Sequence, residues 1–159
     1  MAAWQFKVSL VPKNWVVKTD YDTSLFIGEY GYDTSIAWVN NQPKNDIQEI
    51  IKKYLPKAES WCEGISCWGD NKTTDIQVCF ENGLIEDITI RIDLNEELTD
   101  MIKKSVLLAE DLNCIFYLPE ADEIIERNEY ILTTFANNSN AAKFVKKPEE
   151  FLRAISNKT

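Results

Sequence analysis

The chain has 159 residues, contains no histidine and carries a formal net charge of −9, with 17 Lys and Arg against 26 Asp and Glu. Because it lacks imidazole, the sequence excludes histidine-dependent serine and cysteine hydrolases, histidine proton shuttles and metal sites with histidine ligands. The acidic excess disfavours contact with the phosphates of nucleic acids and favours a basic protein as partner.

Composition indicates a soluble protein built from one domain. Hydrophobic residues make up 45% of the chain and charged residues 27%, which is too apolar for a disordered protein. No apolar stretch approaches the roughly 20 residues of a membrane-spanning helix, and the first residues lack the pattern of a secretory signal. We therefore expect a single globular domain over residues 1–159, located in the cytoplasm and without membrane contact.

The first third of the chain is predicted to hold a strand, a hairpin and a helix. Apolar and polar residues alternate over residues 4–10, which is typical of a half-buried strand, and Pro12 ends it. Residues 24–28 and 34–39 are predicted to form a hairpin of two short strands. A helix over residues 45–55, capped at its first or second residue and stopped by the proline that follows, completes this part.

A second hairpin is predicted around residues 81–83, because apolar residues alternate on both sides of them. A two-residue loop at this turn would pair Val78 with Asp87, placing an apolar side chain opposite an acidic one. A three-residue loop, with its glycine in the left-handed conformation, pairs Phe80 with Leu84 instead. The alternation therefore favours the three-residue loop.

A long helix and a buried strand are predicted next. Asp93 and Glu96 resemble a capping box at the helix start, and apolar residues recur at helical spacing over residues 98–112. Asn113 is a plausible left-handed stop, and the apolar run 114–118 is typical of a buried strand. Strand, helix and strand in this order predict a parallel crossover.

The last part of the chain is predicted to be helical, over residues 120–136 and again over residues 148–156. The final helix has proline at its first position and two glutamates in its first turn, which suits the helix dipole. We therefore predict an α+β fold with a mainly antiparallel sheet, one parallel crossover strand and helices packed mostly on one face.

The four cysteines predict no metal motif. None of Cys62, Cys67, Cys79 and Cys114 belongs to a Cys-x-x-Cys pair, and no histidine is present to complete a zinc site. Cys79 and Cys114 lie in apolar runs and are expected to be small buried side chains. We expect four reduced thiols, with a disulfide between Cys62 and Cys67 only in an oxidising compartment.

A short sequence occurs twice, eleven residues apart, with Tyr21 and Asp22 in the first copy and Tyr32 and Asp33 in the second. One interpretation is that each Asp-Thr-Ser forms a side-chain-to-backbone turn that leads into a strand. The other is that the two Tyr-Asp pairs form an exposed aromatic and acidic surface that binds a partner.

Two tryptophans and two carboxylates lie close together in the sequence, at Trp61, Glu63, Trp68 and Asp70. They predict either a sugar-binding groove, in which indole faces stack on pyranose rings, or a strand with half-buried indoles followed by a turn. A glycosidase would also need two carboxyl groups about 5 Å or about 6.5–9.5 Å apart.

Several common sites are not encoded. The five glycines do not form a dinucleotide fingerprint or a phosphate-binding loop, and no calcium-binding loop is present. The basic cluster Lys143, Lys146 and Lys147 is interrupted by apolar residues and is interpreted as a solvated helix junction. The sequence does not decide whether carboxylates alone hold a metal ion.

The segment Arg91-Ile92-Asp93-Leu94, followed by the long helix and the strand 114–118, resembles small uncharacterised bacterial proteins that look like immunity proteins of polymorphic toxins. The resemblance covers the middle third of the chain and rests on pattern, not on a catalytic motif. It implies a cytoplasmic protein that binds a partner and has no catalytic residues.

We therefore expect a non-enzymatic acidic binding protein, most concretely an immunity protein that neutralises a basic toxin enzyme, such as a nuclease, by occupying its active site. The two Tyr-Asp pairs and the Trp61–Asp70 segment are the candidate partner-binding residues. The alternative is a carboxylate-dependent hydrolase or a glycan-binding protein that uses Trp61, Trp68 and nearby acids, and a purely structural role is the third possibility. No catalytic, cofactor-binding or metal-ligating residue, no cofactor and no nucleic-acid partner is predicted.

Overall fold

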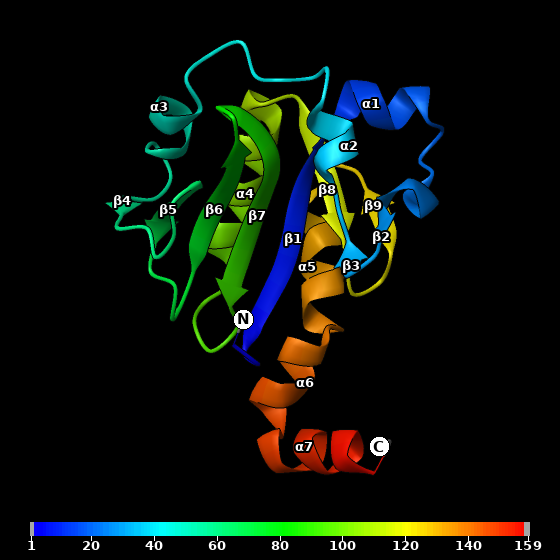
Figure 1. Ribbon diagram of the computed structural model, residues 1–159. Helices are drawn as coiled ribbons and strands as arrows, with labels where there is room; N and C mark the ends of the chain where they lie inside the picture. Colours follow the sequence, from blue (N-terminus) through cyan, green and yellow to red (C-terminus); the bar gives the residue numbers. More distant parts are fainter. Residues whose placement is uncertain (1, 158–159) are drawn as a thin grey trace.

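The centre of the structure, a computed structural model that describes residues 2–157, is a seven-stranded sheet. Its strand order is β4-β5-β6-β7-β1-β8-β9, and all neighbouring strands are antiparallel (Figure 1). The strands are β1 (Gln5–Pro12), β4 (Lys57–Ala58), β5 (Ile65–Gly69), β6 (Asp75–Glu81), β7 (Leu84–Asp93), β8 (Cys114–Leu118) and β9 (Glu123–Ile125). A separate two-stranded sheet pairs β2 (Ile27–Gly28) with β3 (Gly31–Tyr32).

Helices lie on both sides of this sheet. They are α1 (Lys13–Lys18), the 3-10 helix η1 (Thr23–Phe26), α2 (Ser35–Trp38), α3 (Ile47–Ile51), α4 (Thr99–Asp111), α5 (Glu129–Asn137), α6 (Asn140–Lys146) and α7 (Pro148–Ser156). In Figure 1, α4 lies behind the sheet, while α1, α2 and the β2–β3 hairpin lie in front of one end of it. The predicted α+β class with a mainly antiparallel sheet is confirmed.

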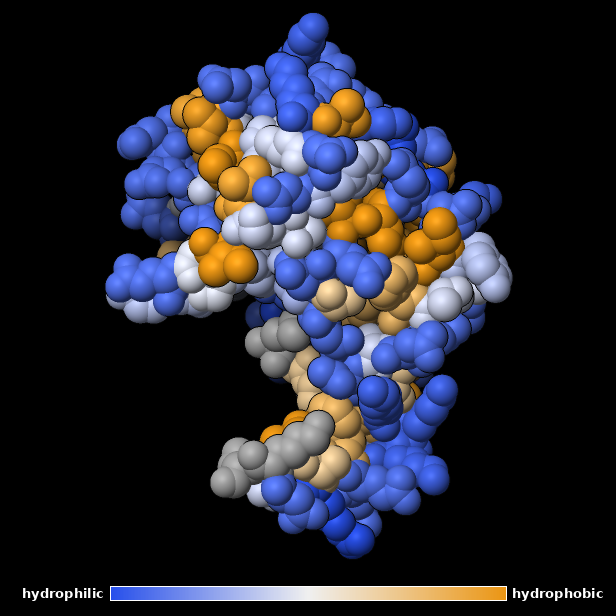
Figure 2. Space-filling model, turned by 90° about the vertical axis from the view of Figure 1, so that its right-hand side faces the viewer, coloured by the Kyte–Doolittle hydropathy of each residue, from blue (hydrophilic) through white to orange (hydrophobic). Residues whose placement is uncertain are grey.

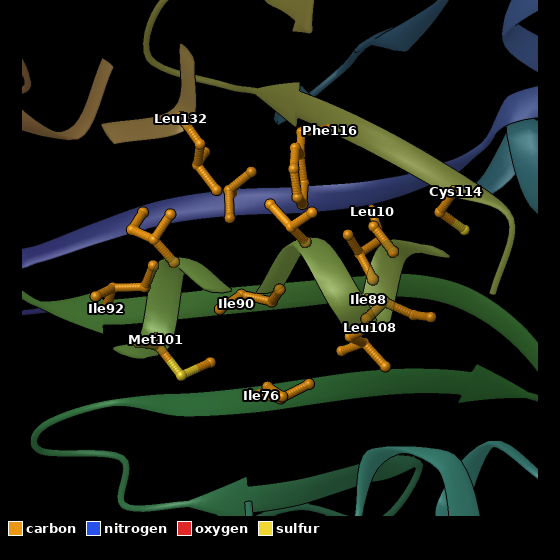
Figure 3. Packing of buried hydrophobic residues seen from close by; sticks show 14 of the residues in the cluster. Leu10, Ile76, Ile88, Ile90, Ile92, Met101, Leu108, Cys114, Phe116 and Leu132 are labelled. Atoms are coloured by element: carbon orange, nitrogen blue, oxygen red, sulfur yellow. The ribbon is translucent and has the colours of Figure 1, made fainter. Parts of the chain in front are cut away.

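The main core lies between the sheet and the helices α3, α4 and α5. Because side chains alternate along a strand, one face of β1 and β7 carries Leu10, Ile88 and Ile90, which are fully buried. Figure 3 shows these side chains converging with Leu108 of α4. Full burial of one such side chain stabilises a fold by roughly 1.5–3 kcal/mol, so this face is the main source of stability.

A second, smaller core covers the other face at the β1–β8–β9 end. It contains Val11, Val16, Phe26, Ile115 and Tyr117, and the rings of Phe26 and Tyr117 lie with their centroids 4.8 Å apart. This cluster is formed by η1, α1 and α2 because the chain runs directly from β1 into α1. The expected packing of helices mostly on one face therefore holds for α3, α4 and α5 but not for these short helices.

The predicted parallel crossover strand is wrong. The strands β7 and β8 are both antiparallel to β1, so they run in the same direction, but β1 lies between them. The connection through α4 therefore joins two strands that are not neighbours. An N-terminal strand that inserts between them is a long-range pairing, which a local strand-helix-strand pattern does not reveal.

The turn between β6 and β7 also differs from the prediction. Asn82 and Gly83 have φ values of 53° and 77°, so they form a two-residue loop of the primed type, and Phe80 pairs with Ile85. Glu86 is then an extra residue on β7, a β-bulge that shifts the register by one. The bulge returns the later apolar residues to the core face, which removes the mismatch on which the three-residue loop was predicted.

The capping box predicted from Asp93 and Glu96 does not start α4. Asp93 remains in β7, where its side chain accepts a hydrogen bond of 2.8 Å from the backbone N–H of Asn95. The helix begins at Thr99, whose backbone N–H donates to the carboxylate of Glu97 at 2.8 Å. The longer strand β7 postpones the helix by several residues.

The prediction for the region after α4 is confirmed for residues 113–118 and wrong for the start of residues 120–136. Asn113 has the predicted left-handed conformation, with a φ of 50°, and all five residues of β8 are buried. The predicted helix over residues 120–136 is instead the edge strand β9 followed by α5. A turn with Asp122 at a φ of 51° precedes β9, and Asn128 caps α5 by accepting from the backbone N–H of Ile131 at 3.0 Å.

The hairpin and the helix that follow the first strand are shorter than predicted, whereas that strand is confirmed as β1 (Gln5–Pro12). The hairpin over residues 24–28 and 34–39 shrinks to β2 and β3, with helical turns before and after it. The helix predicted over residues 45–55 is α3, which Asp46 caps by accepting from the backbone N–H of Gln48 at 2.9 Å. All four cysteines are free thiols, so no disulfide joins Cys62 and Cys67.

The C-terminal helices α6 and α7 form an arm, and Figure 2 shows the molecule hollowed between this arm and the body. The predicted helix Pro148–Ser156 is confirmed as α7, which contacts α6 through an edge-on packing of Phe144 and Phe151 with ring centroids 5.9 Å apart. Within residues 2–157 no helix has both the length and the apolar character needed to cross a bilayer.

Candidate functional site

The sheet has a polar face, which lies opposite the main core on β1, β6 and β7. Figure 1 shows no long helix in front of β6 and β7 on this side, and the short helix α2 packs against β7. Alternation along the strands directs polar side chains there because the apolar ones occupy the core face. The side chains of the polar face are Lys7, Asp75, Gln77, Cys79, Asp87, Thr89 and Arg91.

A buried ion pair holds one end of the polar face. Asp75 and Arg91 are cross-strand partners, and the Nε of Arg91 donates to Oδ1 of Asp75 at 2.7 Å while its Nη2 donates to Oδ2. Their side chains are 1% and 13% exposed. Hydrogen bonding to Asp75 raises the pKa of Arg91. Gln77 adds a bond from its Nε2 to Oδ2 of Asp75 at 3.0 Å, so three polar side chains form one fixed network.

A second carboxylate, Asp87, lies further along β7. Burial raises its pKa, and this effect is opposed by hydrogen bonds from two hydroxyl groups and by the charge of Lys7. Thr89 donates to Oδ2 at 2.5 Å and Thr34 donates to Oδ1 at 2.9 Å. Because Thr34 immediately precedes α2, Asp87 connects this short helix to the sheet.

Three further carboxylates lie at this end of the polar face and form what we call the acidic rim: Asp33, Glu81 and Glu86. The negative charge of Asp33 raises the pKa of both Glu86 and Asp87. The pKa of Glu86 is raised by a hydrogen bond to Glu81, by partial burial and by the negative charges of Glu81 and Asp33. Among the ion pairs within residues 2–157, none involves a residue of the acidic rim or Asp87. The rim is therefore a concentration of negative charge that the described part of the chain does not neutralise by contact.

Apolar and aromatic side chains are exposed on the elements that carry or adjoin the residues of the acidic rim. Leu84 is the cross-strand partner of Glu81 and is 53% exposed. Ile36 of α2 is 45% exposed, and Tyr30 at the tip of the β2–β3 hairpin is 96% exposed. Tyr32 lies under the Lys7 ammonium, which is 4.8 Å from the ring centroid. The rim thus combines charge with surface that a partner can bury.

A pocket of about 320 Å³ lies at the other end of the polar face. It is lined by Ala2, Trp61, Asn71, Gln77 and Arg91. Trp61 belongs to the loop before β5 and is 63% exposed, so its indole forms a wall of the pocket that solvent reaches. Gln77 and Arg91 connect this pocket to the Asp75 network.

The two copies of the repeated sequence lie in different places. Tyr32 and Asp33 border the polar face, whereas the hydroxyl of Tyr21 donates to Glu126, beyond β9, at 2.9 Å. The turn interpretation is confirmed, because Asp22 and Asp33 each accept a hydrogen bond from the backbone N–H two residues later, at 3.0 and 2.9 Å. These turns lead into η1 and α2, not into strands.

The tryptophan segment is also divided. Trp68 is 1% exposed in the main core, with the Lys57 ammonium 4.1 Å from its ring centroid, whereas Trp61 faces the pocket on the other side of the sheet. Glu63 is exposed in the loop, and Asp70 accepts from the backbone N–H of Lys72 at 2.9 Å in a turn. The two indoles therefore do not line a common groove.

The sequence did not single out Asp75, Gln77, Asp87 or Lys7 as site residues. Their only local signal is the alternation of β1, β6 and β7, which places them opposite the apolar residues. Recognising that Asp75 meets Arg91 requires the register of β6 against β7, and the bulge at Glu86 determines that register. The alternation was therefore visible in the sequence, but which of these side chains meet depends on how the strands pair.

No metal site is assembled within residues 2–157, because no three carboxylate or thiol side chains lie close enough together to hold an ion. The polar face instead offers one neutralised ion pair, one half-buried carboxylate and an acidic rim without contacting cations among the described residues. Comparison of the chain with profiles of known protein families, with curated proteins and with solved structures finds no match.

Proposed function

We propose that this protein is a non-enzymatic binding protein that docks a cationic protein through the acidic rim and the adjoining polar face. The observation that carries the proposal is that Glu81 and Asp33 lie near Glu86, and Asp33 near Asp87, while none of these carboxylates forms an ion pair among the described residues. Negative charges that lie close together destabilise one another, and a Lys or Arg side chain from a partner relieves this repulsion.

The charge of the whole chain supports the same kind of partner. A net charge of −9 steers a basic surface toward the protein and raises the association rate at low salt. Steering acts over about a Debye length, about 8–10 Å at physiological salt, so it selects the sign of the partner's charge and not its identity. The acidic rim then provides the local contact.

Exposed side chains on the elements that carry or adjoin the rim residues supply the apolar part of the interface. Leu84, Ile36 and Tyr30 are 53%, 45% and 96% exposed, and each has surface to lose on binding. Interfaces concentrate their binding energy in a few such anchors, with tyrosine among the most frequent. Charge alone gives speed and specificity, whereas these anchors lengthen the lifetime of the complex.

The most concrete form of this function is inhibition of a basic enzyme. Carboxylates on a firm scaffold imitate the phosphates of a nucleic acid, so the acidic rim is suited to occupy the cleft of a nuclease. This agrees with the resemblance of the middle of the chain to immunity proteins of polymorphic toxins. The protein would then protect the cell that produces it from such a toxin.

The test compares two double variants of equal net charge. Glu81→Gln with Glu86→Gln removes charge from the rim, and Glu123→Gln with Glu129→Gln removes the same charge from exposed positions of β9 and α5. Wild type and both variants are immobilised, and proteins captured from a lysate of the source cells are quantified at low salt and at about 0.5 M salt. The captured partner is then purified, identified and assayed with each form.

The proposal predicts a basic partner that wild type and the β9–α5 variant retain at high salt and that the rim variant loses at least tenfold. It also predicts that wild-type protein inhibits the enzymatic activity of that partner. Equal capture by both variants, or a mixture of basic proteins that high salt removes from all three forms, would show that the rim is not the docking surface. A retained partner whose activity is unaffected would overturn the inhibitor function.

A further inference from the structure

The pocket beside Trp61 contains polar atoms that the described part of the chain leaves without partners. Arg91 uses Nε and Nη2 for Asp75, and within residues 2–157 its Nη1 makes no hydrogen bond. Gln77 uses Nε2 for Asp75, and its Oε1 has no protein partner there. The side-chain amide of Asn71 is equally free, since only its backbone oxygen accepts a bond, from Gln5. The pocket therefore offers both donors and acceptors.

These groups are held in place before any ligand arrives. Asp75 is 1% exposed and anchors both Arg91 and Gln77, so neither side chain needs to be immobilised on binding. The backbone of Asn71 is fixed because its oxygen, like that of Thr73, accepts from Nε2 of Gln5 in β1. Preorganised groups of this kind reduce the entropic cost of binding.

The charge of the pocket indicates a neutral ligand. The positive charge of Arg91 is matched by the carboxylate that holds it, and no lysine lines the pocket. A phosphate or nucleotide would meet a protein of net charge −9, and the described residues that line the pocket offer it no free cation. The remaining chemistry is an exposed indole beside an amide, a guanidinium N–H and a carbonyl oxygen.

We propose that this pocket binds a neutral polyhydroxylated ring, that is, one sugar residue of a glycan or a free monosaccharide. The C–H face of the ring lies on the indole of Trp61, and its hydroxyl groups donate to Oε1 of Gln77 and accept from Nη1 of Arg91. Asn71 provides a further amide at the rim of the pocket. An aromatic wall with a few fixed polar groups is the usual composition of a small-molecule site.

This site is separate from the docking surface proposed above. The pocket lies where Arg91 and Asp75 pair, whereas the acidic rim lies at the hairpin end of β6 and β7, where Glu81 pairs with Leu84. Sugar binding in the pocket does not depend on which protein docks at the acidic rim. Removal of charge from the acidic rim therefore leaves sugar binding unchanged.

The experiment is a titration of the full chain followed by NMR. The probes are glucose, galactose, mannose and N-acetylglucosamine, with adenosine and inorganic phosphate as ligands of other classes. The reporters are the indole N–H of Trp61 and the Nε–H of Arg91, which the bond to Asp75 protects. We expect saturable shifts of both signals with at least one sugar, and no saturable shift with phosphate.

Variants locate the site. Trp61→Ala weakens sugar binding by about tenfold, because the stacking surface is lost, and Gln77→Met, which removes the acceptor, weakens it severalfold. Tyr30→Ala, which deletes another highly exposed aromatic side chain at the hairpin tip, leaves binding unchanged, as does Glu81→Gln with Glu86→Gln. Spectra away from the pocket show that each variant is folded.

Three results would overturn the proposal. The first is the absence of a saturable shift with any of the sugars. The second is sugar binding that survives in Trp61→Ala with unchanged affinity, since the ligand would then lie elsewhere. The third is binding of adenosine in this pocket more tightly than every sugar, which would make the ligand a planar base.

Discussion

The two faces of the central sheet are built from the same strands, with one residue for each face in turn, yet they are built for different purposes. The core face carries Leu10, Ile88 and Ile90, which are fully buried against α4. The polar face carries Asp75, Arg91 and Asp87, which are shielded but remain charged or hydrogen-bonded. A single β-strand period of two residues thus separates the apolar core from the polar face.

Burial has opposite effects on the free energy of folding on the two faces. A buried isoleucine contributes free energy of folding without further conditions. A buried carboxylate is tolerated only while its partners are present, because an unpaired charge in the interior is costly. On the polar face, the effect of a single substitution on stability therefore depends on whether the partner of the substituted group stays behind.

The largest expected effect follows from breaking the ion pair on the polar face. Arg91→Met leaves the carboxylate of Asp75 buried and unpaired, and we expect a loss of about 3–5 kcal/mol in the free energy of unfolding. The double variant Asp75→Leu with Arg91→Met recovers most of this loss, since no charge remains buried. Urea denaturation of the three forms measures both values. A single variant within about 1 kcal/mol of wild type would mean that water solvates this face as it does a surface.

A slightly smaller effect is expected on the core face. Ile90→Ala removes buried methyl groups and leaves a cavity, and we expect a loss of about 3 kcal/mol. The same substitution at Ile36, which is 45% exposed, is expected to cost about 0.5 kcal/mol or less. Thermal and urea unfolding compare the two. Similar losses at both positions would contradict the placement of Ile90 in the main core and of Ile36 at the surface.

The smallest effect concerns the acidic rim and depends on pH. The pKa of Glu86 is raised above its ordinary value of 4.5. The carboxyl group of Glu86 therefore binds its proton more tightly in the folded chain than in the unfolded chain. Its ionisation at neutral pH therefore destabilises the fold, and Glu86→Gln is expected to stabilise it by about 0.5 kcal/mol or less, because solvent screens a partly exposed side chain.

This gain should disappear as the pH falls below 4.5, where the carboxyl group is protonated in both states. Urea midpoints measured from pH 7 to pH 4 give the comparison, with Glu123→Gln on β9 as the control. A gain that is constant over this range would show that the glutamine acts through packing and not through charge.

Much of the sheet was predictable because its signals are local. The alternation identified the core-facing residues of β1, of β6 and of β7 from Ile88 onward, and the apolar run of β8 indicated a fully buried strand. It was wrong at Leu84, which is exposed, while Ile85 is buried in its place. Asn113 and Pro148 marked the end of α4 and the start of α7, because their backbone preferences act within one or two residues. The long-range order of the strands has no such local signal.

The site was predicted only in fragments. Tyr32, Asp33 and Trp61 were among the candidates and do border the polar face, whereas Tyr21 and Asp22 lie near β9 and Trp68 is buried in the core. Proximity in the sequence suggested that Trp61 and Trp68 act together, but they lie on opposite sides of the sheet. The sequence contains all of these residues without indicating which of them meet.

The sequence by itself determined the sign of the charge, the absence of histidine chemistry, the α+β class and the inward side of each long strand. These properties depend on composition and on a period of two residues. Only the tertiary structure decided that β1 inserts between β7 and β8, that a bulge at Glu86 sets the register and that Asp75 meets Arg91. The physical reason is that such contacts close long loops, and their free energy depends on residues far away in the chain.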